Sequence, residues 1–318
     1  MVTKKFISVI PIAFCDEGNI EELYKRLTKV LKKITLRYEI IYVNDASPDN
    51  SENILRRLAK KDKHLTVIIH SRNFGAQNAF ATGMKHAQGD AVVIMDGDLQ
   101  DPPELIESFI DKWTKGYDVV YGARRKRENS MGKLLEWAYH SFYIIFHKLS
   151  YMPVPLDAGD FSLMDRKVVN HINNLPEKDR FIRGLRAWVG FKQIGVNYNR
   201  PERFSGKSTN SFRRNMFWVR KAIFSFSYAP LEWVFYIAII SILISIFAIF
   251  MYLILYFLIP NSPRGFLTIL LSVLFIGSVQ LVVLSIICEY LKRIFEEVKS
   301  RPSAIISEII NNHHRKNI

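Results

Sequence analysis

The chain has 318 residues, carries 44 Lys and Arg against 30 Asp and Glu, and is 49% hydrophobic. Its two cysteines exclude the disulfide framework of a small secreted domain. A formal net charge of +14 raises the question of nucleic-acid binding, but the charge gathers beside two long apolar runs near the carboxyl end, which fits an anionic membrane surface better.

The first part of the chain alternates between short apolar runs and amphipathic segments. Strands are predicted over residues 6–12, 39–43, 66–69, 91–95 and 118–121. Helices are predicted after Asn19 as N-cap, over residues 51–61, after Gly75 and over residues 103–113. Such β/α alternation predicts an α/β fold with a doubly wound, mostly parallel sheet. Because the amino terminus runs straight into the first strand, no signal peptide is expected.

Polar clusters follow the predicted strands, at the point where each strand ends. These clusters are residues 15–17, 44–45, 71–73, 96–98 and 124–125. In a parallel sheet the carboxyl ends of the strands lie on one edge, where open α/β sheets bind their ligands. The clusters are therefore expected to converge on one site.

The most specific cluster follows the fourth predicted strand. Asp96 and Asp98 flank Gly97, and Gln100 precedes a proline pair that starts the next helix. Hard oxygen donors at alternate positions suit Mg²⁺ or Mn²⁺, which can clamp a diphosphate. An acidic turn that caps the next helix is the alternative. The chain has no G-x-x-x-x-G-K-[ST] and no G-x-G-x-x-G after its first strand, which argues against P-loop NTPases and dinucleotide-dependent oxidoreductases.

Two apolar runs, residues 231–259 and 265–288, each exceed the ~20 residues that a membrane-spanning helix needs. A buried core hairpin is the alternative. Basic residues flank the pair, and the connecting loop holds only one, so the positive-inside rule predicts that both ends and the large domain are cytoplasmic. Residues 134–151 and 211–228 mix aromatic with basic residues, as interfacial helices do; packing against the sheet is the alternative for both.

Several stretches resemble the family 2 glycosyltransferases of GT-A fold. In chain order they are PIAFCDEGNI, VNDASPDNS, SRNFGAQNAFATG, GDAVVIMDGDLQDPPE and VVYGARRKRE. The resemblance is closer to the polyprenyl-phosphate glycosyltransferases, which include dolichol-phosphate mannose synthases and GtrB-type enzymes, and DLQDPPE is its most specific element. Later matches are LDAGDFSLMDRKVV, RFIRGLRAWVGF, the R-x-x-G-x-S of residues 203–208, and SFSYAPL.

A GtrB-type protein is a catalytic domain followed by two membrane spans, and this resemblance defines the expected organisation. Residues 1–210 form a cytoplasmic GT-A domain, 211–229 a juxtamembrane amphipathic helix, 230–290 the two transmembrane helices, and 291–318 a cytoplasmic basic tail. The protein is expected in the inner (plasma) membrane as a multi-pass protein. The resemblance also implies a homo-oligomer, a tetramer.

The resemblance implies a role for each matching site residue. The nucleotide base and ribose pocket is lined by Pro11, Phe14, Glu17 and Asp45. Asp96 lies against the donor ribose and sugar, and the metal ligands are Asp98 and Gln100. The donor or acceptor phosphates are contacted by Arg124 and Arg203, and Asp157 approaches the donor sugar or the acceptor. The first loop is one residue longer than the family pattern, and Thr209-Asn210 replace its usual lysine-tyrosine.

A lipid phosphate is anionic at pH 7 and needs no strong base to become a nucleophile. The divalent ion neutralises the leaving nucleoside diphosphate, and arginines offset the incoming phosphate. The expected reaction is the inverting transfer of a hexose, glucose from UDP-glucose, to polyprenyl (undecaprenyl) phosphate. The alternatives are GDP-mannose or another UDP-sugar as donor, a membrane flippase or transporter, and a non-catalytic nucleotide-sugar-binding anchor.

Overall fold

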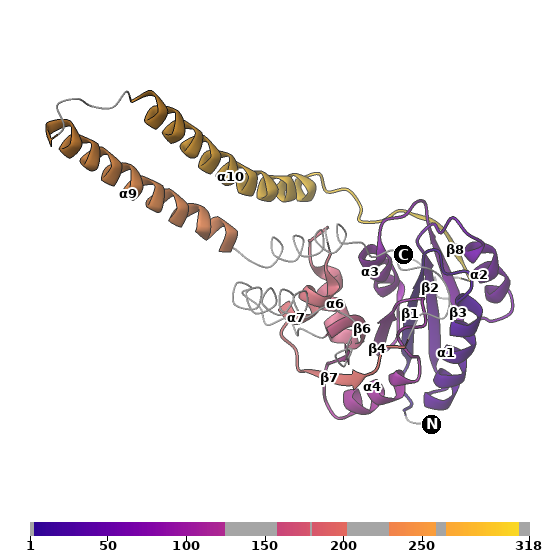
Figure 1. Cartoon of the computed structure of the whole chain (residues 1–318). Coiled ribbons are helices and arrows are strands. Elements are labelled where there is room, and N and C mark those ends of the chain that lie inside the picture. The colour runs from indigo at the N-terminus through magenta and orange to yellow at the C-terminus, as the bar shows by residue number, and fades with distance from the viewer. Residues whose placement is uncertain (1–2, 125–157, 179, 202–228, 259–264, 312–318) are drawn as a thin grey trace. The chain divides into compact units, whose positions relative to one another are not determined.

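The computed structural model describes residues 3–124, 158–178, 180–201, 229–258 and 265–311 (Figure 1). These residues form two compact units. The sheet unit combines the described residues up to 201 with those from 301 onward, and the hairpin unit comprises residues 229–300. Asp157, Arg203 and the two predicted interfacial helices lie outside the described residues.

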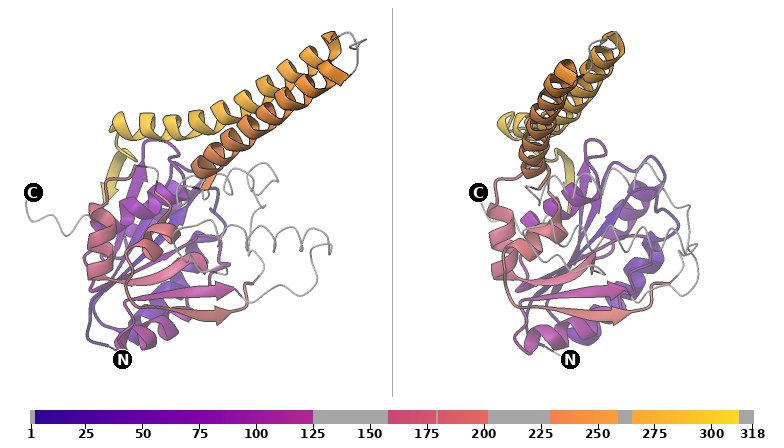
Figure 2. Two further views of the ribbon diagram at one scale, coloured as in Figure 1. Left: turned by 90° about the vertical axis from the view of Figure 1, so that its left-hand side faces the viewer. Right: turned by 60° about the vertical axis from the view of Figure 1, so that its left-hand side comes forward.

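One mixed sheet of eight strands forms the centre of the sheet unit, in the order β7-β5-β6-β4-β1-β2-β3-β8. Its strands are β1 (Ile7–Ala13), β2 (Tyr38–Asn44), β3 (Leu65–His70), β4 (Ala91–Met95), β5 (Val119–Arg124), β6 (Ala158–Asp165), β7 (Gln193–Tyr198) and β8 (Ile306–Ile310). The first four are mutually parallel, whereas β6 runs antiparallel between β4 and β5. β5 and β7, the magenta and salmon arrows of Figure 2, are parallel neighbours.

Helices cover both faces of this sheet. Their bounds are α1 (Ile20–Ile34), α2 (Ser51–Ala59), α3 (Ala76–His86), α4 (Leu105–Thr114), α6 (Arg166–Asn174) and α7 (Ile182–Trp188). α1 contacts α2 and α4, and their apolar faces enclose the main hydrophobic core with the sheet. α3 packs on β1 and β2, and a Cβ at Gly83 would lie 2.3 Å from a methyl carbon of Ile10, so glycine permits this close approach.

The five predicted strands and the four predicted helices are confirmed. Parallel strands are covered on both faces and therefore read as continuous apolar runs, as β1, β2 and β4 do. Asn19 does precede α1, but its side chain donates to Asp16 Oδ1 (3.1 Å) and makes no capping bond to the helix. Strands β6, β7 and β8 and helices α6 and α7 were not predicted.

The expected basic tail over residues 291–318 differs from the structure. Helix α10 continues to Val298, and strand β8 then pairs antiparallel with the edge strand β3. The Ser71 N–H donates to the Ile305 carbonyl (3.0 Å), and Arg56 Nη1 donates to Glu308 Oε1 (3.0 Å). Asn311, at φ 57°, donates from its side chain to the carbonyls of Ala59, Asp62 and Leu65. Residues 301–311 are thus part of the sheet unit.

Asn311→Ala is expected to lower the free energy of unfolding by about 1–2 kcal/mol, because it removes these hydrogen bonds and places alanine in a left-handed conformation. Chemical denaturation of the full-length protein in detergent measures the change, with Asn174→Ala, at an exposed position of α6, as control. Equal stability of the two variants would show that Asn311 does not fasten the strand.

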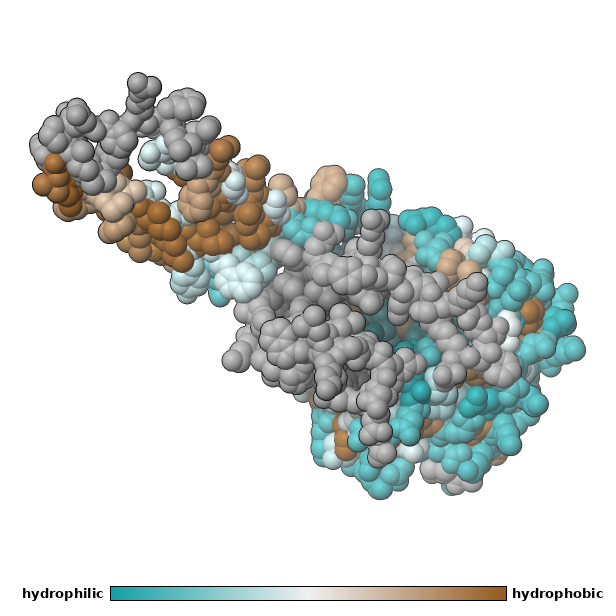
Figure 3. Space-filling model, viewed as in Figure 1, coloured by the Kyte–Doolittle hydropathy of each residue, from teal (hydrophilic) through white to brown (hydrophobic). Residues whose placement is uncertain are grey.

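The hairpin unit contains two long apolar helices, α9 (Ala229–Leu258) and α10 (Phe266–Val298), which contact each other. Within them, Ala229–Met251 and Ser272–Val298 are long and apolar enough to cross a membrane. Their surface is mostly hydrophobic, whereas the described surface of the sheet unit is mostly hydrophilic (Figure 3). The hydroxyls of Ser245, Ser272 and Ser278 each donate to a carbonyl one turn earlier (2.8 Å), so these groups are satisfied within the helix, as a lipid environment requires.

Candidate active site

The acidic loop that follows β4 lies directly against the end of β1. A Cβ at Gly97 would stand 2.2 Å from the Ile12 carbonyl oxygen, so only glycine allows this approach. Leu99 has a φ of 59°, in the left-handed region, and is buried. The Asp98 carboxylate accepts the Gln100 N–H (3.1 Å) and is 7% exposed. The loop therefore holds the Asp98 carboxylate in a fixed, largely dry position.

The acidic loop carries three carboxylates, Asp96, Asp98 and Asp101, and the antiparallel strand β6 adds a fourth. Ile94 pairs with Ser162, and continuing that register places Asp160 opposite Asp96. Burial, together with the nearby carboxylates of Asp101, Asp160 and Asp98, raises the pKa of Asp96 to about 8, and Arg200 opposes this rise. The Asp96 carboxyl therefore holds a proton more readily than an isolated aspartate does. The neighbouring carboxylates disfavour further negative charge at this position.

Arginines offset part of this charge. Arg183, on α7, donates to Asp160 through Nε (3.0 Å) and Nη2 (3.1 Å), and Gln77 on α3 donates to the same carboxylate (3.1 Å). Burial alone would raise the pKa of Asp160, but Arg183 and Gln77 hold it below its ordinary value. Arg200 Nη2 lies 3.9 Å from Asp98 Oδ2. Arg183 and Arg200 therefore place positive charge beside two of the carboxylates.

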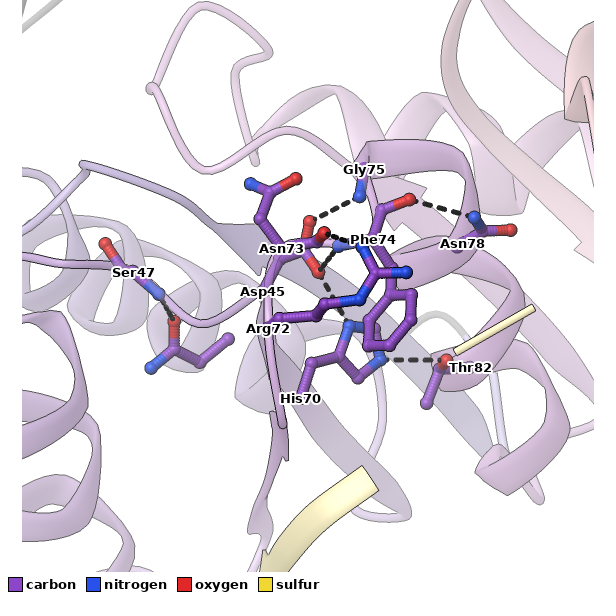
Figure 4. Close-up of polar contacts among 10 residues, drawn as sticks. Asp45, Ser47, His70, Arg72, Asn73, Phe74, Gly75, Asn78 and Thr82 are labelled. Atoms are coloured by element: carbon purple, nitrogen blue, oxygen red, sulfur yellow. Dashed lines mark hydrogen bonds and ion pairs between the residues drawn. The ribbon is translucent and has the colours of Figure 1, made fainter. Parts of the chain in front are cut away.

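Asp45 organises the loop between β3 and α3 (Figure 4). Its Oδ1 accepts the Phe74 N–H (2.9 Å) and lies 2.7 Å from His70 Nδ1, and its Oδ2 accepts the Gly75 N–H (2.7 Å). His70 Nε2 lies 3.0 Å from the Thr82 hydroxyl. Asp45 thus uses both carboxylate oxygens to shape its own chain. Its predicted contact with a nucleotide stays a prediction.

Hydrogen bonds join the loop after β1 to the loop after β2. The Glu17 carboxylate accepts the Asn50 N–H (2.9 Å), and the Glu17 N–H donates to Asp49 (3.0 Å). Phe14, in the loop after β1, is 42% exposed, whereas Pro11 is buried within β1 beside Met95. Of the residues predicted to line the nucleotide pocket, Phe14 is exposed to solvent. Glu17 is hydrogen-bonded to the loop after β2, and Pro11 is buried in the sheet.

Residues 8–172 match the family model described as glycosyl transferase family 2, more than half of the chain. The chain belongs to glycosyltransferase family 2. A Synechocystis sp. glycosyltransferase, named as uncharacterized, is 40% identical over 304 residues, 95% of each chain. The SfII prophage-derived bactoprenol glucosyl transferase of Shigella flexneri is 37% identical over 308 residues, 95% of this chain and 97% of that protein. Mannosyl-3-phosphoglycerate synthase from Rubrobacter xylanophilus superposes with a TM-score of 0.48 at 17% identity, covering 69% of this chain and 72% of that chain.

Family membership and the mixed α/β sheet confirm the GT-A fold class that the sequence predicts. In this glycosyltransferase the structure brings together Asp96, Asp98, Gln100 and Arg124 at one edge of the sheet. Four further residues of this edge were not predicted as site residues: Asp101, Asp160, Arg183 and Arg200. The aspartates stand inside the DLQDPPE and LDAGDF matches and could have been found there.

The acidic loop of the glycosyltransferase fits a divalent cation. Asp98 and Asp101 are buried, and Asp101 Oδ2 has no hydrogen-bond partner in the described part of the chain. Gln100, which donates to the Pro201 carbonyl (3.2 Å), lies beside them. Within the described ranges, no group of three or more His, Cys, Asp or Glu side chains is arranged around a metal position. Mg²⁺ is typically held by one or two carboxylates with substrate phosphates, so a full protein cage is not required.

Proposed function

We propose that this glycosyltransferase transfers a hexose from a nucleotide sugar to a polyprenyl phosphate at the cytoplasmic face of a membrane. UDP-glucose is the favoured donor and undecaprenyl phosphate the favoured acceptor. The observation that carries the proposal is the 37% identity to a bactoprenol glucosyl transferase over 95% of this chain, because that match includes the two apolar helices as well as the sheet. A soluble acceptor would give those helices no role.

The chain's own residues act mainly by binding and orienting two anions. The acceptor phosphate needs no strong base, because it is already ionised at neutral pH. Its oxygen forms the bond to the anomeric carbon as the bond from that carbon to the nucleoside diphosphate breaks, so one displacement inverts the configuration. Arg124 and Arg200 supply positive charge where the two anions meet. Arg203 would add to this charge, and Asp157 would position the sugar or the acceptor.

Asp98 and Gln100 would hold the divalent cation. When bound, Mg²⁺ or Mn²⁺ neutralises charge on the leaving diphosphate. The support for this assignment is the cluster of neighbouring carboxylates described above, because a divalent cation would relieve their mutual repulsion. Asp96 would then contact the ribose and the sugar of the donor. It would lie near the cation, whose main ligands would be Asp98 and Gln100.

The proposal is tested with the full-length protein in liposomes that contain undecaprenyl phosphate. UDP-glucose, other UDP-sugars and GDP-mannose are supplied separately, with Mg²⁺, Mn²⁺ or a chelator, and lipid-linked sugar is measured by mass spectrometry. The expected result is metal-dependent lipid-linked hexose with the opposite anomeric configuration to the donor. Nucleotide-sugar binding without turnover would favour a non-catalytic anchor, and lipid movement across the bilayer without a new product would favour a flippase; either result would overturn the proposal.

A further inference from the structure

Tyr198, the last residue of β7, joins two parts of the active-site edge. Its hydroxyl donates to Asp101 Oδ1 (2.7 Å) and accepts from Arg124 Nε (3.4 Å). Asp101 belongs to the acidic loop after β4, and Arg124 is the last residue of β5. The hydroxyl therefore links an acid of the loop after β4 to a base at the end of β5.

The tyrosine ring is held in place by its neighbours. A Cβ at Gly122 would lie 2.8 Å from Tyr198 Cε1, so the ring lies directly over the backbone of β5. Its edge meets Phe161, with 6.3 Å between the ring centroids. Tyr198 is 6% exposed, and with the ring fixed its hydroxyl has little freedom to choose another partner.

The Arg124 guanidinium is confined on its other side by β6. A Cβ at Gly159 would lie 3.2 Å from Arg124 Nη2 and 3.5 Å from Nε, so the guanidinium lies against the backbone at Gly159. Although burial opposes its charge, the hydrogen bond to Tyr198 and the nearby Asp101 raise the pKa of Arg124. Nε is engaged by the tyrosine, which leaves the fork of terminal N–H groups as the part suited to bind an anion.

We propose that Tyr198, anchored by Asp101, is a positioning residue that fixes the Arg124 guanidinium for a phosphate group of the substrates. The inference rests on the proposed function, in which Arg124 contacts a phosphate. The phosphate belongs either to the nucleotide sugar or to the lipid acceptor. Both have the same chemistry at the guanidinium, and kinetics separate them.

Tyr198→Phe removes the hydroxyl and keeps the ring. Its kcat/KM is expected to fall about 10-fold, the effect of losing one hydrogen bond to a charged group. The matched control is Tyr42→Phe in β2, because Tyr42 is another buried tyrosine of the sheet and its hydroxyl has no partner among the described residues. This control should keep wild-type kinetics. A higher KM for the nucleotide sugar would assign the phosphate to the donor, and a higher KM for undecaprenyl phosphate would assign it to the acceptor.

The decisive measurement repeats Tyr198→Phe in an Arg124→Ala background. If the tyrosine acts through the arginine, its removal should change kcat/KM there by less than about twofold. A 10-fold loss in both backgrounds, or no loss in the wild-type background, would overturn the inference. Gly159→Ala provides a second approach, because the three atoms nearest to its added carbon all belong to the Arg124 guanidinium. The same kinetic constant should change as in Tyr198→Phe. Failure of the wild-type protein to make any lipid-linked sugar would instead count against the proposed function.

Discussion

Asp98→Asn is expected to lower kcat by about 100-fold or more while the protein keeps its fold. The amide retains the shape of the side chain and the oxygen that accepts the Gln100 N–H, so the loop should stay in place. It removes the charge, however, and an uncharged amide is a weaker ligand for a hard cation. The remaining activity should need a higher concentration of Mn²⁺ or Mg²⁺ than wild type.

Turnover is measured over a series of metal concentrations, and Asp111→Asn is the matched control. Asp111 is a half-exposed acid of α4 that pairs with Lys115 one turn later on the same helix (2.7 Å), so its charge bears on α4 and not on the site. Its variant should behave as wild type. Near-normal turnover of Asp98→Asn that also resists a chelator would mean that Asp98 does not hold the metal.

Arg183→Ala is expected to destabilise the protein by about 2–3 kcal/mol at neutral pH, because the Asp160 carboxylate loses its bidentate partner inside the protein. The cost should fall below that of a fully buried pair, since 34% of the Arg183 side chain is exposed and water can screen part of the change. Denaturation of the full-length protein in detergent measures the loss. Lys115→Ala, which breaks an exposed pair, should change stability by less than about 0.5 kcal/mol.

The effect of Arg183→Ala should depend on pH in a defined direction. The folded-state pKa of Asp160 is lowered, so its ion pair contributes stability above the unfolded pKa of about 4, and this contribution is lost as pH falls through the folded pKa. The difference between wild type and variant should therefore be large at pH 7 and shrink below about pH 4. Asp160→Asn should restore part of the stability in the Arg183→Ala background. A pH-independent difference, or no restoration, would contradict the ion-pair explanation.

The sequence predicts those parts of the fold in which strands and helices alternate. Buried parallel strands leave a clear apolar run, and the polar residues at their ends identify one edge of the sheet. Asp96, Asp98 and Gln100 could be placed there because all three follow a single strand in one short stretch. Asp45 was located at the right edge, yet its engagement by His70, Phe74 and Gly75 depends on how the β3–α3 loop folds back, which no local pattern records.

The remaining part of the site depends on tertiary pairing. Asp160 reaches Asp96 only because β6 enters the sheet antiparallel, between β4 and β5, and in the register that pairs Ile94 with Ser162. A single residue of slippage would turn Asp160 to the opposite face of the sheet. Tyr198 lies on β7, a half-exposed strand whose residues carry no strong apolar pattern. Such residues can be assigned to the site only when the strand order is known.

The pairing of β8 with β3 constrains the topology of the whole chain. Residues that precede the hairpin and residues that follow it share one hydrogen-bonded sheet, and a folded sheet cannot straddle a bilayer. Residues 201 and 301 must therefore lie on the same side of any bilayer that the chain enters, and the chain between them can traverse that bilayer only an even number of times. This parity follows from backbone hydrogen bonds alone and does not depend on the distribution of lysine and arginine. A change in flanking charge could invert the protein as a whole, but it could not separate its two ends without dismantling the edge of the sheet.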